Sequence, residues 1–202
     1  RMEIIKNEMI EIRDQYGDER RTEIVPVDMD FSMEDMIAEE EVVLTITHQG
    51  YIKRTALNTY RTQRRGGRGV QGAMSKEEDF VEHLFIANTH NYMLFFTDQG
   101  KCYWLKVYDI PQGGRAARGR AIVNLIGCDP GEKIEAFVSV KEFDDNHYIA
   151  MATRNGIVKK TVLSAYGKPR KGGIYAIEIR DGDKLIEARV TNGEHDILLG
   201  TS

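Results

Sequence analysis

Residues 63–72, Q-R-R-G-G-R-G-V-Q-G, combine four glycines with three arginines, a composition that disfavours both helix and strand. Glycine has no Cβ and adopts positive φ, so a glycine-rich backbone can lie close against another surface. Arginine carries a permanent charge on a planar guanidinium whose geometry matches phosphate. Such a loop indicates contact with a polyanion, although a single loop of this kind is equally compatible with a solvated hairpin.

Weaker versions of this loop recur downstream, at residues 113–120 and 168–173, and this recurrence favours the polyanion interpretation. We expect the three loops, together with two lysines that precede the third loop, to form a nucleic-acid footprint. The predicted footprint is Gln63, Arg64, Arg65, Gly66, Gly67, Arg68, Gly69, Arg115, Arg118, Arg120, Lys159, Lys160, Lys168, Arg170 and Lys171.

The net charge of −4 conceals two unlike parts of the chain. Residues 1–42 contain five Lys or Arg against 14 Asp or Glu, whereas residues 43–202 contain 23 against 18. Within the second part, residues 43–76 contain seven basic residues and no acidic residue. A polyanion responds to this local field and not to the total charge, so the acidic total does not exclude nucleic-acid binding.

Residues 1–21 predict one amphipathic helix, because their apolar positions recur every three or four residues. Gly17 is expected to weaken or end this helix. The apolar seam needs a partner helix that the chain does not supply. A segment containing Pro26 then predicts an extended linker. The seam residues are Met2, Ile5, Met9, Ile12 and Tyr16.

From Val42 onward, short β-branched and aromatic segments alternate with glycines, which predicts a mainly β fold. Four segments share one pattern, an apolar strand that closes on a threonine, and in the first three a glycine follows three residues later, as a tight hairpin requires. A repeat of about 50 residues with about four antiparallel strands has the size of a propeller blade. We therefore predict three blades and the start of a fourth. The four threonines are Thr47, Thr97, Thr153 and Thr201.

The remaining candidate chemistry is sparse. Cys102 and Cys128 have no C-x-x-C spacing and the five histidines are scattered, so we expect no metal site. The loop at residues 63–72 lacks the G-K-[ST] ending of a nucleotide-binding P-loop. No apolar run is long enough to span a membrane, and the composition favours a cytoplasmic protein. Four aromatic residues are expected in the blade core and not as base-stacking platforms, namely Phe95, Phe96, Tyr103 and Trp104.

Residues 63–69 match the box Q-R-R-G-G-K/R-G of the A subunits of DNA gyrase, which are bacterial type II topoisomerases. Arg68 stands where lysine is frequent. Residues 88–90, 106–108, 118–125 and 151–163 also resemble that family, so the resemblance covers essentially the whole chain. The box is a specific signal, because the related topoisomerase IV A subunits have lost or eroded it.

The resemblance implies a domain organisation. Residues 1–24 would end the coiled-coil arm of the breakage-reunion core, and residues 25–40 would be a linker. Residues 41–202 would form the first half of a C-terminal β-pinwheel that wraps double-stranded DNA.

The resemblance also implies a role in an ATP-dependent enzyme that introduces negative supercoils into DNA. Its partners would be another A subunit together with two B subunits in an A2B2 assembly. The B subunit would handle ATP and Mg²⁺, so no cofactor is expected in this segment. The family's catalytic tyrosine lies in another part of the polypeptide, so no catalytic residue is expected here and the segment by itself should not cut DNA.

Two alternatives remain open. The first is the C-terminal domain of a topoisomerase IV A subunit, from which the intact box separates this chain. The second is a protein-interaction propeller of the kelch or WD-repeat kind. That alternative predicts neither a charge that alternates with blade position nor a leading coiled-coil helix.

Overall fold

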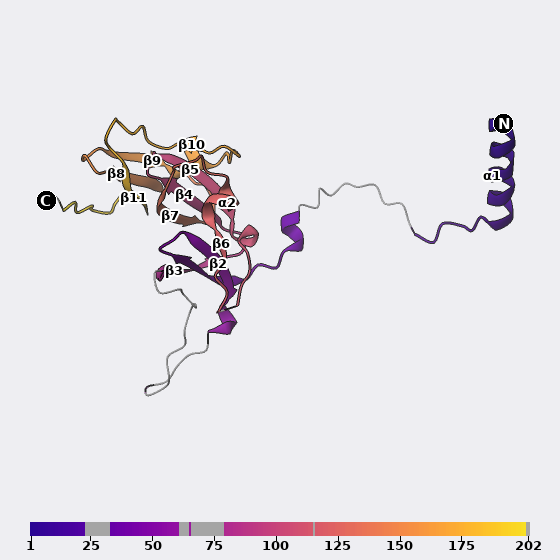
Figure 1. The fold of residues 1–202 in the computed structure, drawn as a ribbon, viewed down its shortest axis with the longest axis horizontal. Helices are drawn as coiled ribbons and strands as arrows, with labels where there is room; N and C mark the ends of the chain where they lie inside the picture. The colour runs from indigo at the N-terminus through magenta and orange to yellow at the C-terminus, as the bar shows by residue number, and fades with distance from the viewer. Residues whose placement is uncertain (23–32, 61–64, 66–78, 115, 201–202) are drawn as a thin grey trace. The chain divides into compact units, whose positions relative to one another are not determined.

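The computed structural model describes residues 1–22, 33–60, 65, 79–114 and 116–200, in two units, Arg1–Met33 and Glu34–Ser202 (Figure 1). The first unit contains helix α1 (Met2–Tyr16), which ends at Gly17 and is therefore shorter than the helix predicted over residues 1–21. The Gly17 N–H donates to the carbonyl oxygen of Arg13 at 2.7 Å. Every side chain of α1 is exposed, including the apolar seam. None of the described helices has both the length and the apolar character that crossing a membrane requires.

The second unit contains three antiparallel sheets, which confirms the predicted mainly β fold with successive blades. Their strand orders are β3-β1-β2-β6, β10-β5-β4-β7 and β11-β8-β9. The strands are β1 (Glu41–Thr47), β2 (Tyr51–Ala56), β3 (Val81–Asn88), β4 (Tyr92–Thr97), β5 (Lys101–Lys106), β6 (Arg120–Ala121), β7 (Ile134–Val140), β8 (Tyr148–Thr153), β9 (Val158–Val162), β10 (Ile174–Tyr175) and β11 (Leu185–Thr191).

The predicted hairpin turn is present once in each sheet. In each turn the glycine N–H donates to the carbonyl oxygen of the threonine three residues earlier. The threonine hydroxyl accepts the N–H of the residue after the glycine, which explains why the strand ends on threonine. The turns run from Thr47 to Gly50 (2.8 Å), from Thr97 to Gly100 (2.9 Å) and from Thr153 to Gly156 (3.0 Å).

The core lies between consecutive sheets. Successive side chains of a strand point to opposite faces, so Phe95 packs toward the first sheet and Phe96 toward the third. Tyr103 is buried, and the half-buried Trp104 donates its indole N–H to the carbonyl oxygen of Tyr166 at 2.9 Å. The aromatic residues therefore contribute to the core, as predicted.

Short helical turns connect these strands. A 3-10 turn follows the second strand of every hairpin. A further 3-10 turn precedes the first sheet, and a short α-helix follows β6. They are η1 (Met33–Met36), η2 (Leu57–Thr59), η3 (Val107–Asp109), α2 (Ile122–Ile126) and η4 (Leu163–Tyr166).

Residues 34–40, which the sequence predicts as the end of a linker, contact the turn between β3 and β4. The Thr89 hydroxyl donates to the Ala38 carbonyl oxygen at 2.8 Å, and Lys106 Nζ donates to Glu34 Oε1 at 2.5 Å. This part of the chain is therefore fastened to the first two blades.

The segment expected to begin a fourth blade forms no strand between residues 194 and 200, and Thr201 lies outside the described residues. Ile197, Leu198 and Leu199 are exposed. A strand requires a neighbour that shares its backbone hydrogen bonds, and none of the described segments pairs with these residues.

Gly100→Ala should destabilise the protein more than Gly156→Ala. Both glycines have positive φ, 81° and 86°, where an L side chain costs about 1–2 kcal/mol. A Cβ on Gly100 would lie 2.2 Å from the carbonyl oxygen of Ile177, whereas a Cβ on Gly156 would meet nothing within 4 Å. Urea unfolding of both variants measures the difference, and equal losses of unfolding free energy would contradict this account.

Candidate nucleic-acid interface

The final strand of each four-stranded sheet comes from the following repeat. β6 follows the glycine/basic loop at residues 113–120 and pairs with β2, while β10 follows the loop at residues 168–173 and pairs with β5 (Figure 1). The Ile122 N–H then donates to the Gly50 carbonyl oxygen at 2.9 Å, and the Ala176 N–H donates to that of Gly100 at 2.8 Å. Each loop therefore crosses from its own blade to the preceding one.

One glycine in each of these loops is required by the crossing. Gly119 has φ 89°, and a Cβ on it would lie 2.3 Å from the carbonyl oxygen of Ile52. Gly173 has φ 70°, and its Cβ would lie 2.9 Å from the carbonyl oxygen of Cys102. The surface that these two glycines approach is the preceding blade, so strand crossing accounts for them without any ligand.

The three sheets converge at the ends opposite these crossings. Residues of β3, β7 and β11, which end the sheets on that side, line one cavity of about 370 Å³. Three of the four charged residues on these strands other than histidine are acidic, Glu82, Glu135 and Glu187. At the other ends, β6 and β9 carry only basic charged residues, Arg120, Lys159 and Lys160, and β10 carries no charged residue. We call β6, β10, β9 and the loops at residues 113–120 and 168–173 the basic edge.

Part of the predicted footprint lies outside the described residues, and Arg65, the one described member of the first loop, is exposed. The structure therefore leaves the first loop as a prediction. The undescribed footprint residues are Gln63, Arg64, Gly66, Gly67, Arg68, Gly69 and Arg115.

Four predicted cations of the basic edge are exposed, Arg120, Lys168, Arg170 and Lys171. In the described part of the chain, no side chain forms a hydrogen bond or an ion pair with any of them. Lys160 is also exposed, and its Nζ lies 4.5 Å from the ring centroid of Tyr148. A phosphate could approach these five cations without displacing a charged partner.

Two other predicted cations make contacts within the protein. Lys159 Nζ donates to the carbonyl oxygen of Ala176, just after β10, at 2.6 Å. Arg118 Nη2 donates to Gln49 Oε1 at 2.7 Å and lies 3.7 Å from Asp79 Oδ2. Their assignment as phosphate contacts stays a prediction, and the contacts favour a second role in joining repeats.

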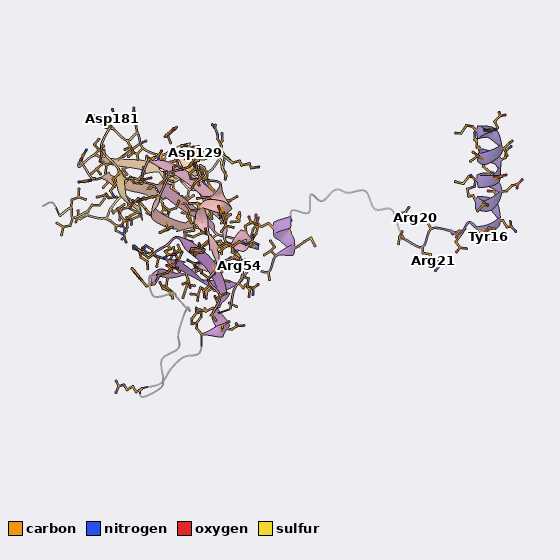
Figure 2. All side chains as sticks on the ribbon, viewed as in Figure 1. Tyr16, Arg20, Arg21, Arg54, Asp129 and Asp181 are labelled. Carbon is orange, nitrogen blue, oxygen red and sulfur yellow. The ribbon has the colours of Figure 1, made fainter. Side chains whose placement is uncertain are left out.

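The basic run at residues 43–76 includes two cations that donate to carbonyl groups of the protein, the buried Lys53 and the half-buried Arg54. Lys53 is 1% exposed, and its Nζ donates to the carbonyl oxygen of Gly114 at 3.1 Å. Burial lowers the pKa of Lys53 below its ordinary value. Arg54 (Figure 2) donates from Nε to the carbonyl oxygen of Ile110 at 2.7 Å. Neither residue belongs to the predicted footprint, and both side chains bind carbonyl groups of the protein itself.

The sheet explains why Lys53 is buried, and no local sequence pattern indicated it. Lys53 lies opposite Thr45 in the register of β1 and β2, and six of the seven residues of β1 are buried. A lysine that is paired with such a buried strand cannot reach water with its ammonium group. It therefore donates a hydrogen bond to a nearby carbonyl oxygen.

The second repeat contains a buried acid, Glu132, beside its hairpin. Glu132 accepts a hydrogen bond from the Tyr103 hydroxyl at 2.8 Å, and Lys101 pairs with both Glu132 and Asp129. The hydrogen bond to Asp129 raises the pKa of Lys101, and burial, followed by the contact with Glu132, raises the pKa of Tyr103 to about 12. Both groups therefore keep their protons at neutral pH.

These features define a propeller-like domain in which a strand of the following repeat completes the preceding sheet. Cations lie along its basic edge. The chain belongs to the family described as DNA gyrase C-terminal domain, beta-propeller, whose model matches residues 41–88, 91–141 and 147–192.

Curated relatives agree with this family. The chain is 51% identical over 199 residues to the DNA gyrase A protein of Clostridium acetobutylicum, and 50% identical over 197 residues to that of Neisseria gonorrhoeae. Each comparison covers 98% of this chain but 24% and 22% of the relative. The chain thus spans about a quarter of the length of the relatives that it matches.

Solved structures show the same fold. The C-terminal domain of DNA topoisomerase IV is 32% identical, with a TM-score of 0.66 over 78% of this chain and 48% of that one. A DNA gyrase A C-terminal domain is similar in fold, with a TM-score of 0.59 at 24% identity over 75% of this chain and 48% of that one. The fold is common to gyrase and topoisomerase IV, so the sequence relatives and not the fold associate this chain with gyrase A.

Lys53→Gln should destabilise the protein, whereas Arg120→Gln should not. A hydrogen bond from a charged group is worth about 1.5–3 kcal/mol, and Lys53 makes one in the sheet interior. Arg120 is exposed, and exposed substitutions change the unfolding free energy by about 0.5 kcal/mol or less. Chemical denaturation of the two variants compares them directly. A stable Lys53→Gln protein would show that this lysine does not join the loop to the sheet.

Proposed function

We propose that this chain is a DNA-binding and DNA-wrapping part of a DNA gyrase A protein. One observation supports this proposal most: each described glycine/basic loop leads into the strand that ends the preceding sheet. Exposed cations therefore recur from blade to blade along the basic edge. A duplex that follows this edge would meet a phosphate-binding group at each blade.

The physical basis is electrostatic and independent of DNA sequence. Arginine and lysine that neutralise phosphates release condensed counterions, and this release supplies affinity for any duplex. Bending a site of 20–30 base pairs costs about 1–6 kcal/mol, which several such contacts can offset. The acidic strands at the converging ends of the sheets would repel the duplex and so favour the basic edge.

The proposed phosphate contacts among the described residues are Arg65, Arg120, Lys160, Lys168, Arg170 and Lys171. Apart from Arg118, the rest of the predicted footprint would add to them, with the box at residues 63–69 foremost. In this proposal residues 1–24 end a coiled-coil arm, residues 25–40 are a linker and residues 41–202 belong to the wrapping domain.

The proposed setting is a cytoplasmic A2B2 assembly that introduces negative supercoils into DNA in an ATP-dependent reaction. The chain would contribute no catalytic group, because the tyrosine that breaks DNA would lie elsewhere in the gyrase A protein. ATP and Mg²⁺ would be bound by the gyrase B protein. The wrap would present one part of the duplex for passage through another.

Affinity for long duplex should fall steeply with salt. If the six described contacts each neutralise one phosphate, the slope of log K against log salt concentration will be about −5.4. Duplexes long enough to follow several blades should bind more tightly than short ones, because a wrap needs length. Fluorescence anisotropy across a salt series measures both effects. A flat salt dependence with no preference for length would instead favour a protein-interaction propeller.

A matched pair of variants locates the contacts. Arg170→Gln combined with Lys171→Gln removes two cations of the basic edge and should make the salt slope shallower by about 1.8. Lys133→Gln removes an equally exposed cation beside β7, at the converging ends of the sheets, and should leave the slope unchanged. Equal effects of the two changes would exclude the basic edge as the binding surface.

A further inference from the structure

Arg118 comes from the loop of the second repeat, but its described contacts belong to the first repeat. Nη2 donates to Gln49 Oε1 at 2.7 Å, and the guanidinium carbon lies 3.7 Å from the ring centroid of Tyr51. Nη2 also lies 3.7 Å from Oδ2 of Asp79. Gln49 lies in the turn of the first hairpin and Tyr51 begins β2, while Asp79 precedes β3. One side chain therefore contacts both the first hairpin and the segment that leads into β3.

Asp79 needs a cation at this position. Its side chain is 2% exposed, while that of Arg118 is 38% exposed. Asp79 Oδ1 accepts the Gln49 N–H at 3.1 Å, which joins the hairpin turn to the start of β3. An ionised carboxylate buried without a counter-charge is strongly destabilising, so Asp79 retains Arg118 beside it.

The other two repeats have an acid at the same position but a different cation arrangement. Asp183 accepts the Asn155 N–H at 2.9 Å in the third repeat, which reproduces the link between turn and strand. Glu132 in the second repeat pairs with Lys101 of its own hairpin. Among these three acids in the described residues, Asp79 is the one that forms an ion pair with the following repeat.

Arg118 lies between two sets of backbone hydrogen bonds. Before it, the Gly113 N–H donates to the Arg54 carbonyl oxygen at 2.9 Å, and after it the two-residue β6 pairs with β2. Gly119 lies against the Ile52 carbonyl group, directly between Arg118 and the exposed Arg120. A displacement of Arg118 would therefore move the strand that carries Arg120.

We propose that Arg118, Asp79 and Tyr51 form a clasp between the first and second repeats. In this clasp Arg118 is a positioning residue that fixes β6 and does not contact a phosphate. The consequence for DNA rests on the proposed function, because the clasp would hold Arg120 at the place where the duplex passes. The clasp itself depends only on the contacts of the protein with itself.

Hydrogen exchange without DNA tests the clasp independently of any DNA role. In the intact protein, Arg118→Gln and Asp79→Asn should increase amide exchange over residues 116–124 about ten-fold or more, since a charged hydrogen-bonded contact is lost. Asp79→Asn is informative because asparagine can still accept the Gln49 N–H. Arg118→Lys should retain part of the protection, and the control Arg120→Gln should retain all of it. Unchanged exchange in Arg118→Gln would overturn the clasp.

The salt dependence of duplex binding then separates positioning from phosphate contact. Arg120→Gln should make the log–log slope shallower by about 0.9, the value for one phosphate. Arg118→Gln should leave the slope unchanged while reducing the linking-number change trapped in a circular plasmid at least two-fold. A slope change in Arg118→Gln equal to that in Arg120→Gln would overturn the positioning role. If the unchanged protein shows no salt-dependent binding, the proposed function fails and the exchange experiment alone decides on the clasp.

Discussion

The structure depends on the pairing of backbone groups at the ends of its sheets. A strand at the end of a sheet leaves a row of N–H and C=O groups unpaired. In the first two sheets the following repeat supplies the missing strand, through β6 and β10. Consecutive repeats must therefore be neighbours in space, and the loop before each exchanged strand must cross at that end of the sheet. The position of the glycine/basic loops follows from this pairing.

The same constraint divides the cations into two groups with different roles. Lys53, Arg54 and Lys159 each donate to a backbone carbonyl group in a connecting segment, at Gly114, Ile110 and Ala176 respectively. These are carbonyl groups that no strand partner satisfies, and a long cationic side chain can reach them. The exposed cations lie on the last paired strands, Arg120 in β6 and Lys160 in β9, or in the loop at residues 168–173, where water hydrates their charge. Charge alone therefore does not identify the surface that a polyanion would meet.

The glycines of the loops show a similar division. Gly119 and Gly173 are needed because their backbones lie against carbonyl groups of the preceding blade. The glycines of these loops are thus explained by the crossing of the chain, whether or not the loop also binds a ligand. Arg120 beside Gly119 and Lys171 near Gly173 are exposed, because the crossing places their backbone at the end of the preceding sheet.

The sequence by itself determined the local elements of this protein. It predicted a leading helix within residues 1–21 that Gly17 weakens or ends, the three hairpins with threonine at one end and glycine at the turn, and the aromatic core, because these depend on residues a few positions apart. It also identified the family through residues 63–69 and related segments. Only the tertiary structure decided which repeat completes which sheet. It also decided which of the described cations bind groups of the protein and which are exposed to solvent. Lys53 and Arg120 look alike in a charge count, yet one lies inside a sheet and the other at its end. That difference arises from pairing between residues more than 60 positions apart, which no local pattern encodes.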